Sequence, residues 1–85
     1  MVGLDSLFAL VRTAISMHVF RPFADTEDFT RDLEIDTDDL SHVALTLENQ
    51  LGVKLDREEY RKVNNVVELA KAFHTALLAK AAGQP

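Results

Sequence analysis

The sequence predicts an all-α fold, a small four-helix bundle of three main helices and one short helix. Apolar residues recur at spacings of three and four in three separate stretches, which is the pattern of amphipathic helices. Proline, glycine and a pair of asparagines separate these stretches, and no alternating run is long enough to imply a sheet. Because each apolar stripe is too wide to leave in water, we expect the helices to pack against one another.

The size and composition indicate one compact domain over residues 1–85. If the 85-residue chain formed two independent cores, each half would be too short to fold without disulfides or a bound metal. The apolar content of 47% and the charged content of 27% are ordinary for a folded protein. The chain has no cysteine, which excludes disulfides, thiolate catalysis, iron–sulfur clusters and cysteine zinc sites. Packing must therefore supply the stability.

The net charge of −5 bears on the possible partners. It would repel nucleic acid and anionic lipid head groups, and it suits a docking partner with a basic patch. No apolar run approaches the length of a membrane span, and no signal peptide is evident. We therefore expect a cytoplasmic monomer with neither a nucleic acid partner nor a membrane span.

The first helix is predicted at about residues 4–19, with Asp5 or Ser6 able to cap its first turn. Pro22 then interrupts the pattern, because proline lacks the amide donor. An ordered loop should continue to Asp36. Three apolar side chains can anchor this loop: Phe23, Phe29 and Leu33.

The second helix is predicted at about residues 37–51 and should end at Gly52, since glycine readily adopts the left-handed conformation that closes many helices. A short third helix should occupy about residues 56–62. Asp56 is its expected cap, and Glu59, three residues later, resembles the second member of a capping box.

The fourth helix is predicted at about residues 66–81, after the break at Asn64 and Asn65. Together the four helices should bury the apolar stripes. The expected core residues are Leu7, Val11, Ile15, Phe29, Leu40, Val43, Leu47, Leu51, Val63, Val66, Leu69 and Phe73.

The polar residues do not form a recognisable metal or catalytic site. The histidines at positions 18, 42 and 74 have no carboxylate at metal-ligand spacing. The acids at 36, 38 and 39 lack the regularly spaced ligands and the glycine of a twelve-residue calcium-binding loop. Acids in the first turn of a helix interact favourably with the positive end of the helix dipole, which gives these residues a structural role. Thr37 and His42 would point apart on one helix, which argues against a nucleophile and base. We expect no metal site, no catalytic residue and no enzymatic activity.

From Phe29 to Phe73 the chain resembles, without a gap, the acyl carrier protein family. The family pattern is Phe, three residues, Leu-Gly-x-Asp-Ser-Leu, an acidic helix and Phe-Gly-Ile-x-Ile. The matching positions here are Phe29, Leu33, Asp36-Thr37, Leu51-Gly52-Val53-Lys54-Leu55, Glu58-Glu59, Val63 and Val66. The resemblance covers more than half of the chain and implies a four-helix bundle of acyl carrier type.

The resemblance implies a carrier function rather than catalysis. In this family the serine hydroxyl is esterified to 4'-phosphopantetheine, whose thiol carries an acyl group as a thioester between enzymes. Thr37 takes the attachment position here, preceded by Asp36. The expected partners are a phosphopantetheinyl transferase and acyl-transfer or synthase enzymes with basic docking patches, in fatty acid, polyketide or lipid biosynthesis. The expected docking residues are Asp36, Asp38, Asp39, Leu40, His42, Glu48, Glu58 and Glu59.

The chain departs from the family pattern around the attachment position. Thr37 replaces serine, and Asp38 replaces the leucine that follows it. A register shifted by two residues would restore the leucine as Leu40 but would place a carboxylate at the attachment position. In helix two, His42, Asn49 and Gln50 stand where glutamates are usual.

Three alternatives follow from these residues. Gly3 to Leu7 spells the family pentapeptide GLDSL, but Ser6 lacks a preceding helix and the downstream segment at the required distance. Ser41 lies one turn beyond Thr37, at a position that is normally apolar and inward. The third alternative is an unmodified interaction or regulatory module that keeps the carrier fold without the arm.

Overall fold

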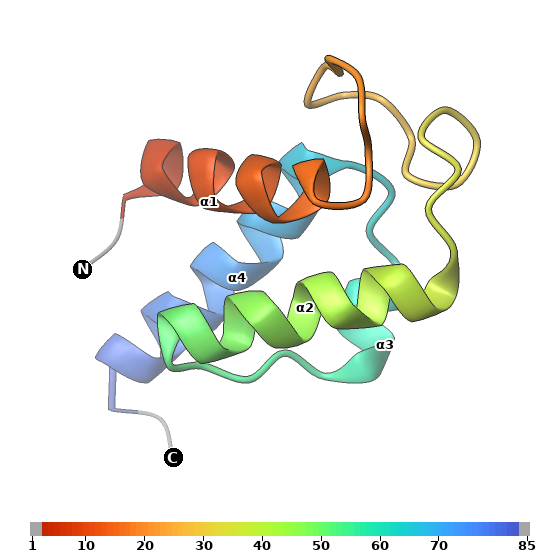
Figure 1. Cartoon of the computed structure of the whole chain (residues 1–85). Coiled ribbons are helices and arrows are strands. Elements are labelled where there is room, and N and C mark those ends of the chain that lie inside the picture. The colour runs from red at the N-terminus through yellow and green to blue at the C-terminus, as the bar shows by residue number, and fades with distance from the viewer. Residues whose placement is uncertain (1–2, 84–85) are drawn as a thin grey trace.

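The computed structural model describes residues 3–83 and contains four helices (Figure 1). Helix α1 spans Leu4–Ser16, α2 spans Thr37–Leu51, α3 spans Arg57–Arg61 and α4 spans Val66–Ala81. The described part of the chain has no strand, so the predicted small all-α bundle is confirmed. The molecule extends over 38 × 24 × 18 Å.

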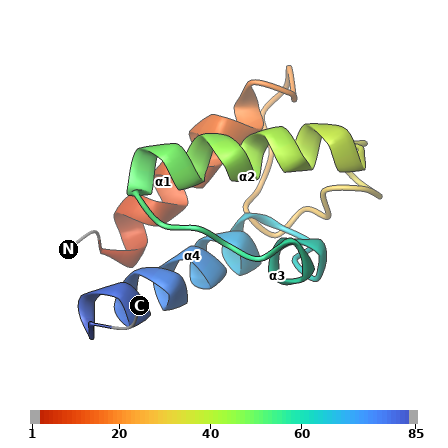
Figure 2. The ribbon, with the colours of Figure 1, turned by 90° about the horizontal axis from the view of Figure 1, so that it is seen from below.

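Helix α1 contacts both α4 and α2, and α3 contacts α4. Figure 2 shows α2 lying across α1, and the long loop passes beside the start of α4. In both views the start of α2 lies at the end of the molecule away from the chain termini. The loop from Met17 to Asp36 forms this end together with α3.

Each long helix buries the stripe that its spacing predicted. Leu7, Val11 and Ile15 of α1 are fully buried, and Leu47 of α2 and Phe73 of α4 are fully buried against them. At roughly 1.5–3 kcal/mol for each large side chain removed from water, this burial is the main stabilising contribution. Three expected core residues are only half-buried at the margin of the core: Leu40, Leu51 and Val63.

The long loop contributes more to the core than expected. Phe29 and Leu33 are buried as predicted, and Phe23 is half-buried against the core. Val19 and Ile35 are buried as well. The Phe29 amide donates to Asn64 O at 2.7 Å, and the Ile35 amide donates to Phe29 O at 2.8 Å. The loop is therefore an ordered layer of the bundle, tied to the turn before α4.

Helix α1 ends three residues earlier than predicted. The Met17 and His18 amides donate to Ala14 O and Ile15 O, which tightens the last turn and ends the helix at Ser16. The expected cap by Asp5 or Ser6 was also wrong, because both residues lie inside the first turn. Gly3 is the N-cap residue of α1, and it has no side chain to cap the helix.

The boundaries of the other helices follow from their end residues. Gly52 closes α2 with φ 69°, as predicted. Asp56 precedes α3, but its side chain accepts no capping bond, so the predicted capping box is absent there. A related pair of capping bonds occurs at α4, where the N-cap Asn65 accepts from the Glu68 amide and Glu68 accepts from the amide of the preceding Asn64, both at 2.9 Å.

Candidate functional site

The start of α2 is held by Asp36. Its backbone is extended, with φ −85° and ψ 175°, and its Oδ1 accepts the Asp39 amide at 2.8 Å. The carboxylate also lies at the positive end of the helix dipole. These interactions place Thr37 as the first residue of α2, with its side chain exposed to solvent.

The Thr37 side chain is available for chemistry. Among residues 3–83, its hydroxyl has no hydrogen-bond partner, whereas its carbonyl oxygen accepts the Ser41 hydroxyl at 2.9 Å. The Ser41 hydroxyl also lies 3.3 Å from the Tyr60 hydroxyl on α3. The Ser41 hydroxyl therefore links α2 to α3, whereas the Thr37 hydroxyl has no partner within residues 3–83.

Thr37 stands at the edge of a hollow of about 280 Å³ between the long loop, α2 and α3. One part of the lining is apolar and includes Leu40 and Val63. Another part is polar and includes Tyr60 and Arg61. Leu40 and Val63 are half-buried because they line this hollow. Sequence reasoning missed Tyr60 and Arg61, whose proximity to Thr37 depends on how α3 folds back towards α2.

The surroundings of Thr37 fit a phosphate ester. The Asp39 and Leu40 amides bond to Asp36, whereas the Thr37 and Asp38 amides have no hydrogen-bond partner within residues 3–83. Helix N-termini favour anions, and Arg61 adds a positive charge to the lining of the hollow. The Asp38 carboxylate opposes this attraction.

Glu34 has a left-handed backbone, with φ 56°. Its neighbours Leu33 and Ile35 are both buried, and the core therefore holds the chain on each side of it. The region of positive φ favours glycine, and glutamate adopts it at a cost. In the ungapped register, position 34 is where the carrier family pattern has glycine.

The expected docking residues on α2 are in different environments. Asp38 and His42 are exposed, and Leu40 lines the hollow. Asp39 Oδ1 lies 3.6 Å from His18 Nδ1, which joins α2 to the segment after α1. Glu48 is half-buried and accepts the Leu55 amide at 2.6 Å, so its carboxylate organises the loop after α2. A charge change at Glu48 would therefore alter this loop as well as any docking.

Glu58 and Glu59 are exposed on α3, where Arg57 and Arg61 are their close neighbours. Charge is in fact distributed unevenly along the chain. Residues 3–40 contain nine acids and three arginines, whereas residues 41–83 contain five acids and six lysines or arginines. The acidic surface is thus contributed by the first half of the chain rather than by α3.

The three arginines of the first half are each paired with an acid. Arg12 makes a bidentate contact with Asp25 at 2.8 Å, Arg21 lies 3.1 Å from Glu27, and Arg31 lies 3.3 Å from Asp32. In each pair the arginine hydrogen bond lowers the pKa of the carboxyl below its usual value. The acids near Thr37 are left without an arginine from this half of the chain.

The other sequence-derived sites lie apart from this arrangement. Ser6 is exposed in the first turn of α1, at the opposite end of the molecule from the start of α2 (Figure 1). No group of three or more metal-ligating side chains occurs within residues 3–83. A second hollow, of about 310 Å³, lies at the other end of α2 beside Glu48 and Lys54. Thr37 is not part of its lining.

No helix within residues 3–83 is long and apolar enough to cross a membrane. Comparison with known protein families and with curated proteins found no family and no protein that the chain matches.

Proposed function

We propose that the chain is a carrier protein that holds an acyl or related group on 4'-phosphopantetheine attached to Thr37. The observation that carries this proposal is the exposed Thr37 hydroxyl at the first position of α2, at the edge of a hollow that is partly apolar. The left-handed backbone of Glu34 supports the register that assigns Thr37 to the attachment position.

The residues of the chain would position and shelter the arm. Asp36 caps α2 and fixes the position of Thr37. Arg61 and the free amides of the first turn favour the phosphate, while Leu40 and Val63 offer apolar surface to the arm. The bound arm would supply a thiol that carries the acyl group, and its length would keep that group at high effective concentration near partner enzymes.

The attachment step would be catalysed by a phosphopantetheinyl transferase. The Thr37 oxygen would attack the phosphorus atom of coenzyme A that bears the pantetheine arm. A phosphate ester bond would form at Thr37, the pyrophosphate bond would break, and adenosine 3',5'-bisphosphate would leave. The Thr37 proton would pass to a base of the transferase or to water.

A second candidate is an unmodified interaction module with the same fold. It is favoured by two features of the site, the methyl group that Thr37 carries beside its hydroxyl and the exposed Asp38 carboxylate next to it. The methyl group crowds the hydroxyl, and the carboxylate repels an incoming phosphate.

Intact mass spectrometry separates the two candidates. The full chain is incubated with coenzyme A and a broad-specificity phosphopantetheinyl transferase, alongside Thr37→Ser and Thr37→Ala variants. We expect the wild type to gain one phosphopantetheine, Thr37→Ser to gain it faster because the methyl group is gone, and Thr37→Ala to gain none. Ser6→Ala and Ser41→Ala serve as controls and should be modified as the wild type is.

Modification of Thr37→Ser alone, with every transferase tried, would favour the unmodified module. An arm that peptide mapping places on Ser6 or Ser41 would overturn the assignment to Thr37.

A further inference from the structure

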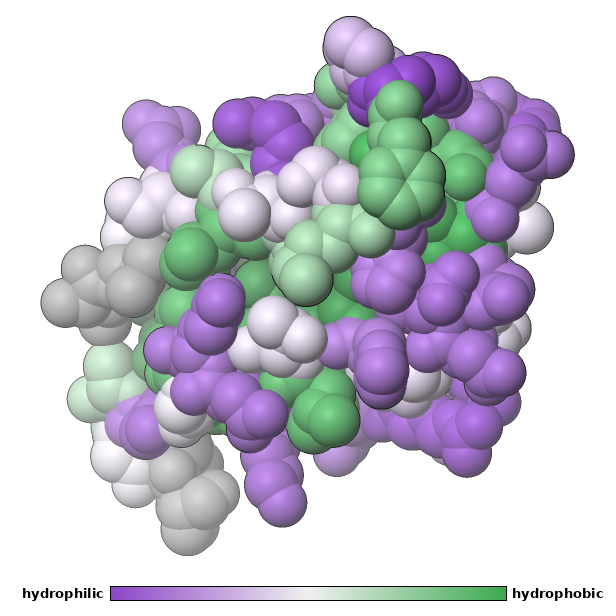
Figure 3. All heavy atoms as spheres, in the orientation of Figure 1, coloured by the Kyte–Doolittle hydropathy of each residue, from purple (hydrophilic) through white to green (hydrophobic). Residues whose placement is uncertain are grey.

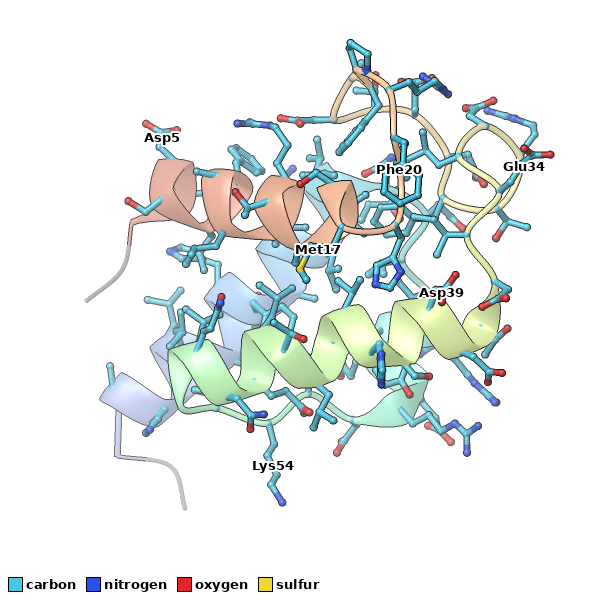
Figure 4. The ribbon with its side chains drawn as sticks, in the orientation of Figure 1. Asp5, Met17, Phe20, Glu34, Asp39 and Lys54 are labelled. Carbon is cyan, nitrogen blue, oxygen red and sulfur yellow. The ribbon has the colours of Figure 1, made fainter. Side chains whose placement is uncertain are left out.

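Two large apolar side chains project into solvent just after α1. Phe20 is 94% exposed and Met17 is 69% exposed. Figure 4 shows them on the same side of the molecule, above Asp39 at the start of α2. Figure 3 shows hydrophobic atoms gathered over this junction of α1, the loop and α2, beside a strongly hydrophilic region.

The segment that carries Phe20 is fixed. On one side of Phe20, Val19 is buried in the core. On the other side, Arg21 donates to Pro22 O at 2.8 Å, to Glu27 Oε1 at 3.1 Å and to Asp32 O at 3.1 Å. The exposed ring is therefore presented by an ordered backbone, and binding would need little further ordering.

The charge around this apolar pair is acidic. The arginines at 12, 21 and 31 are each paired with an acid, whereas Asp38 is exposed and Asp39 Oδ1 lies 3.6 Å from His18 Nδ1. The His18–Asp39 contact joins the apolar segment to the acidic end of α2. The exposed apolar side chains thus lie near Asp39, and Asp38 precedes Asp39 in the first turn of α2.

We propose that Met17, Phe20, Asp38 and Asp39 form a docking surface for a partner protein that presents an apolar face edged by lysine or arginine side chains. Phe20 is the anchor of this surface, because buried aromatic side chains supply much of the binding energy at the centres of protein interfaces. The acids set the orientation and accelerate the encounter. The inference goes beyond the carrier proposal, since it holds whether or not Thr37 bears an arm.

The negative charge of this surface also argues against other binding partners. A second copy of the chain would bring the same acidic surface, and two such surfaces repel each other. An anionic membrane would be repelled in the same way. Within residues 3–83, the other exposed large apolar residues, Leu45 and Leu78, lie on α2 and α4 and are less exposed, at 53% and 46%.

The test uses the full chain labelled with ¹⁵N and a synthetic helical peptide with leucines on one face and lysines along its edges. We expect the peptide to shift the amide signals of residues 17–21 and 37–39. Phe20→Ser should weaken binding at least about tenfold, and Asp38→Asn with Asp39→Asn should weaken it and reduce its salt dependence. A peptide with glutamates in place of the lysines should not bind.

Leu78→Ser is the matched control, because it removes an exposed leucine outside the proposed surface and should leave binding unchanged. Thermal unfolding of each variant, followed by circular dichroism, checks that the fold is kept. Phe20 is exposed, so its replacement should not lower the melting temperature.

Shifts confined to another surface, or unchanged binding by Phe20→Ser, would overturn the proposal. It would also fail if the wild type formed dimers that Phe20→Ser dissolves, measured by analytical ultracentrifugation. Binding to vesicles of phosphatidylserine and phosphatidylcholine that Phe20→Ser abolishes would assign the surface to a membrane instead.

Discussion

Glu34 combines a left-handed backbone, at φ 56°, with an exposed side chain. Replacement with glycine removes the steric cost of this conformation, about 1–2 kcal/mol, but adds conformational entropy to the unfolded chain, about 0.5–1 kcal/mol. We expect Glu34→Gly to leave the free energy of unfolding unchanged or to raise it by up to about 1.5 kcal/mol. Glu34→Val should lower it by more than about 1 kcal/mol, because a branched side chain tolerates positive φ poorly. Urea denaturation measures both changes.

Thr30→Gly is the control for position 34, since Thr30 is an exposed residue of the same loop and its φ is not positive. It should lower the free energy of unfolding through the entropy of the unfolded chain alone. Equal losses in Thr30→Gly and Glu34→Gly would contradict the strain assigned to Glu34.

Single-residue features differ in how far the sequence could reveal them. Gly52 and Asp36 were predictable, because glycine and aspartate are typical of the end and the start of a helix. Glu34 was not, since nothing in a glutamate indicates positive φ. The role of Glu48 was also hidden, because its bond to Leu55 depends on how the loop after α2 returns along the helix.

Helix α3 is the element whose attachment to the bundle is weakest. It has five residues, none of them buried. The Tyr60 hydroxyl, 3.3 Å from that of Ser41, is its hydrogen-bonded tie to α2. We expect Tyr60→Phe to keep the packing of the ring, to lower the free energy of unfolding by no more than about 1.5 kcal/mol, and to speed hydrogen exchange at residues 57–61 above that at residues 43–47.

Ser41→Ala removes the contact with the Tyr60 hydroxyl by deleting its partner on α2. Ser41→Ala also removes the bond to Thr37 O, so the double variant should lose little more stability than Ser41→Ala alone. Unchanged exchange at residues 57–61 in Tyr60→Phe would mean that another contact holds α3.

At the scale of elements, the sequence predicted all four helices, and the limits of α2 and α4 were correct. Their spacing, caps and glycine agree with one another. The end of α1 was wrong because His18 and Val19 continue the apolar spacing, although the chain has already turned at Ser16. The position of α3 beside Thr37, and hence the hollow, could not be read from periodicity, which describes single helices and not how they meet.

For the molecule as a whole, the uneven distribution of charge is visible in the sequence, but its pairing is not. Each arginine of the first half meets an acid 1, 6 or 13 residues away, and only the folded loop determines which one. These pairs hold the loop together and leave the acids near Thr37 free of arginine from this half. The candidate docking surface is thus a consequence of the whole fold.

The Arg12–Asp25 pair should make part of the stability depend on pH. The pKa of Asp25 is lowered chiefly by the Arg12 hydrogen bond, and also by its charge, so the unfolded chain binds a proton at a higher pH than the folded chain does. Stability from this pair is therefore present above the usual aspartate pKa of 3.8 and is lost as the pH falls through the lowered value. A double-mutant cycle of Arg12→Gln and Asp25→Asn isolates it, because other titrating groups cancel. We expect a favourable coupling in thermal unfolding at pH 6 that disappears towards pH 2, and a coupling that persisted there would show that the contact does not depend on the charge of Asp25.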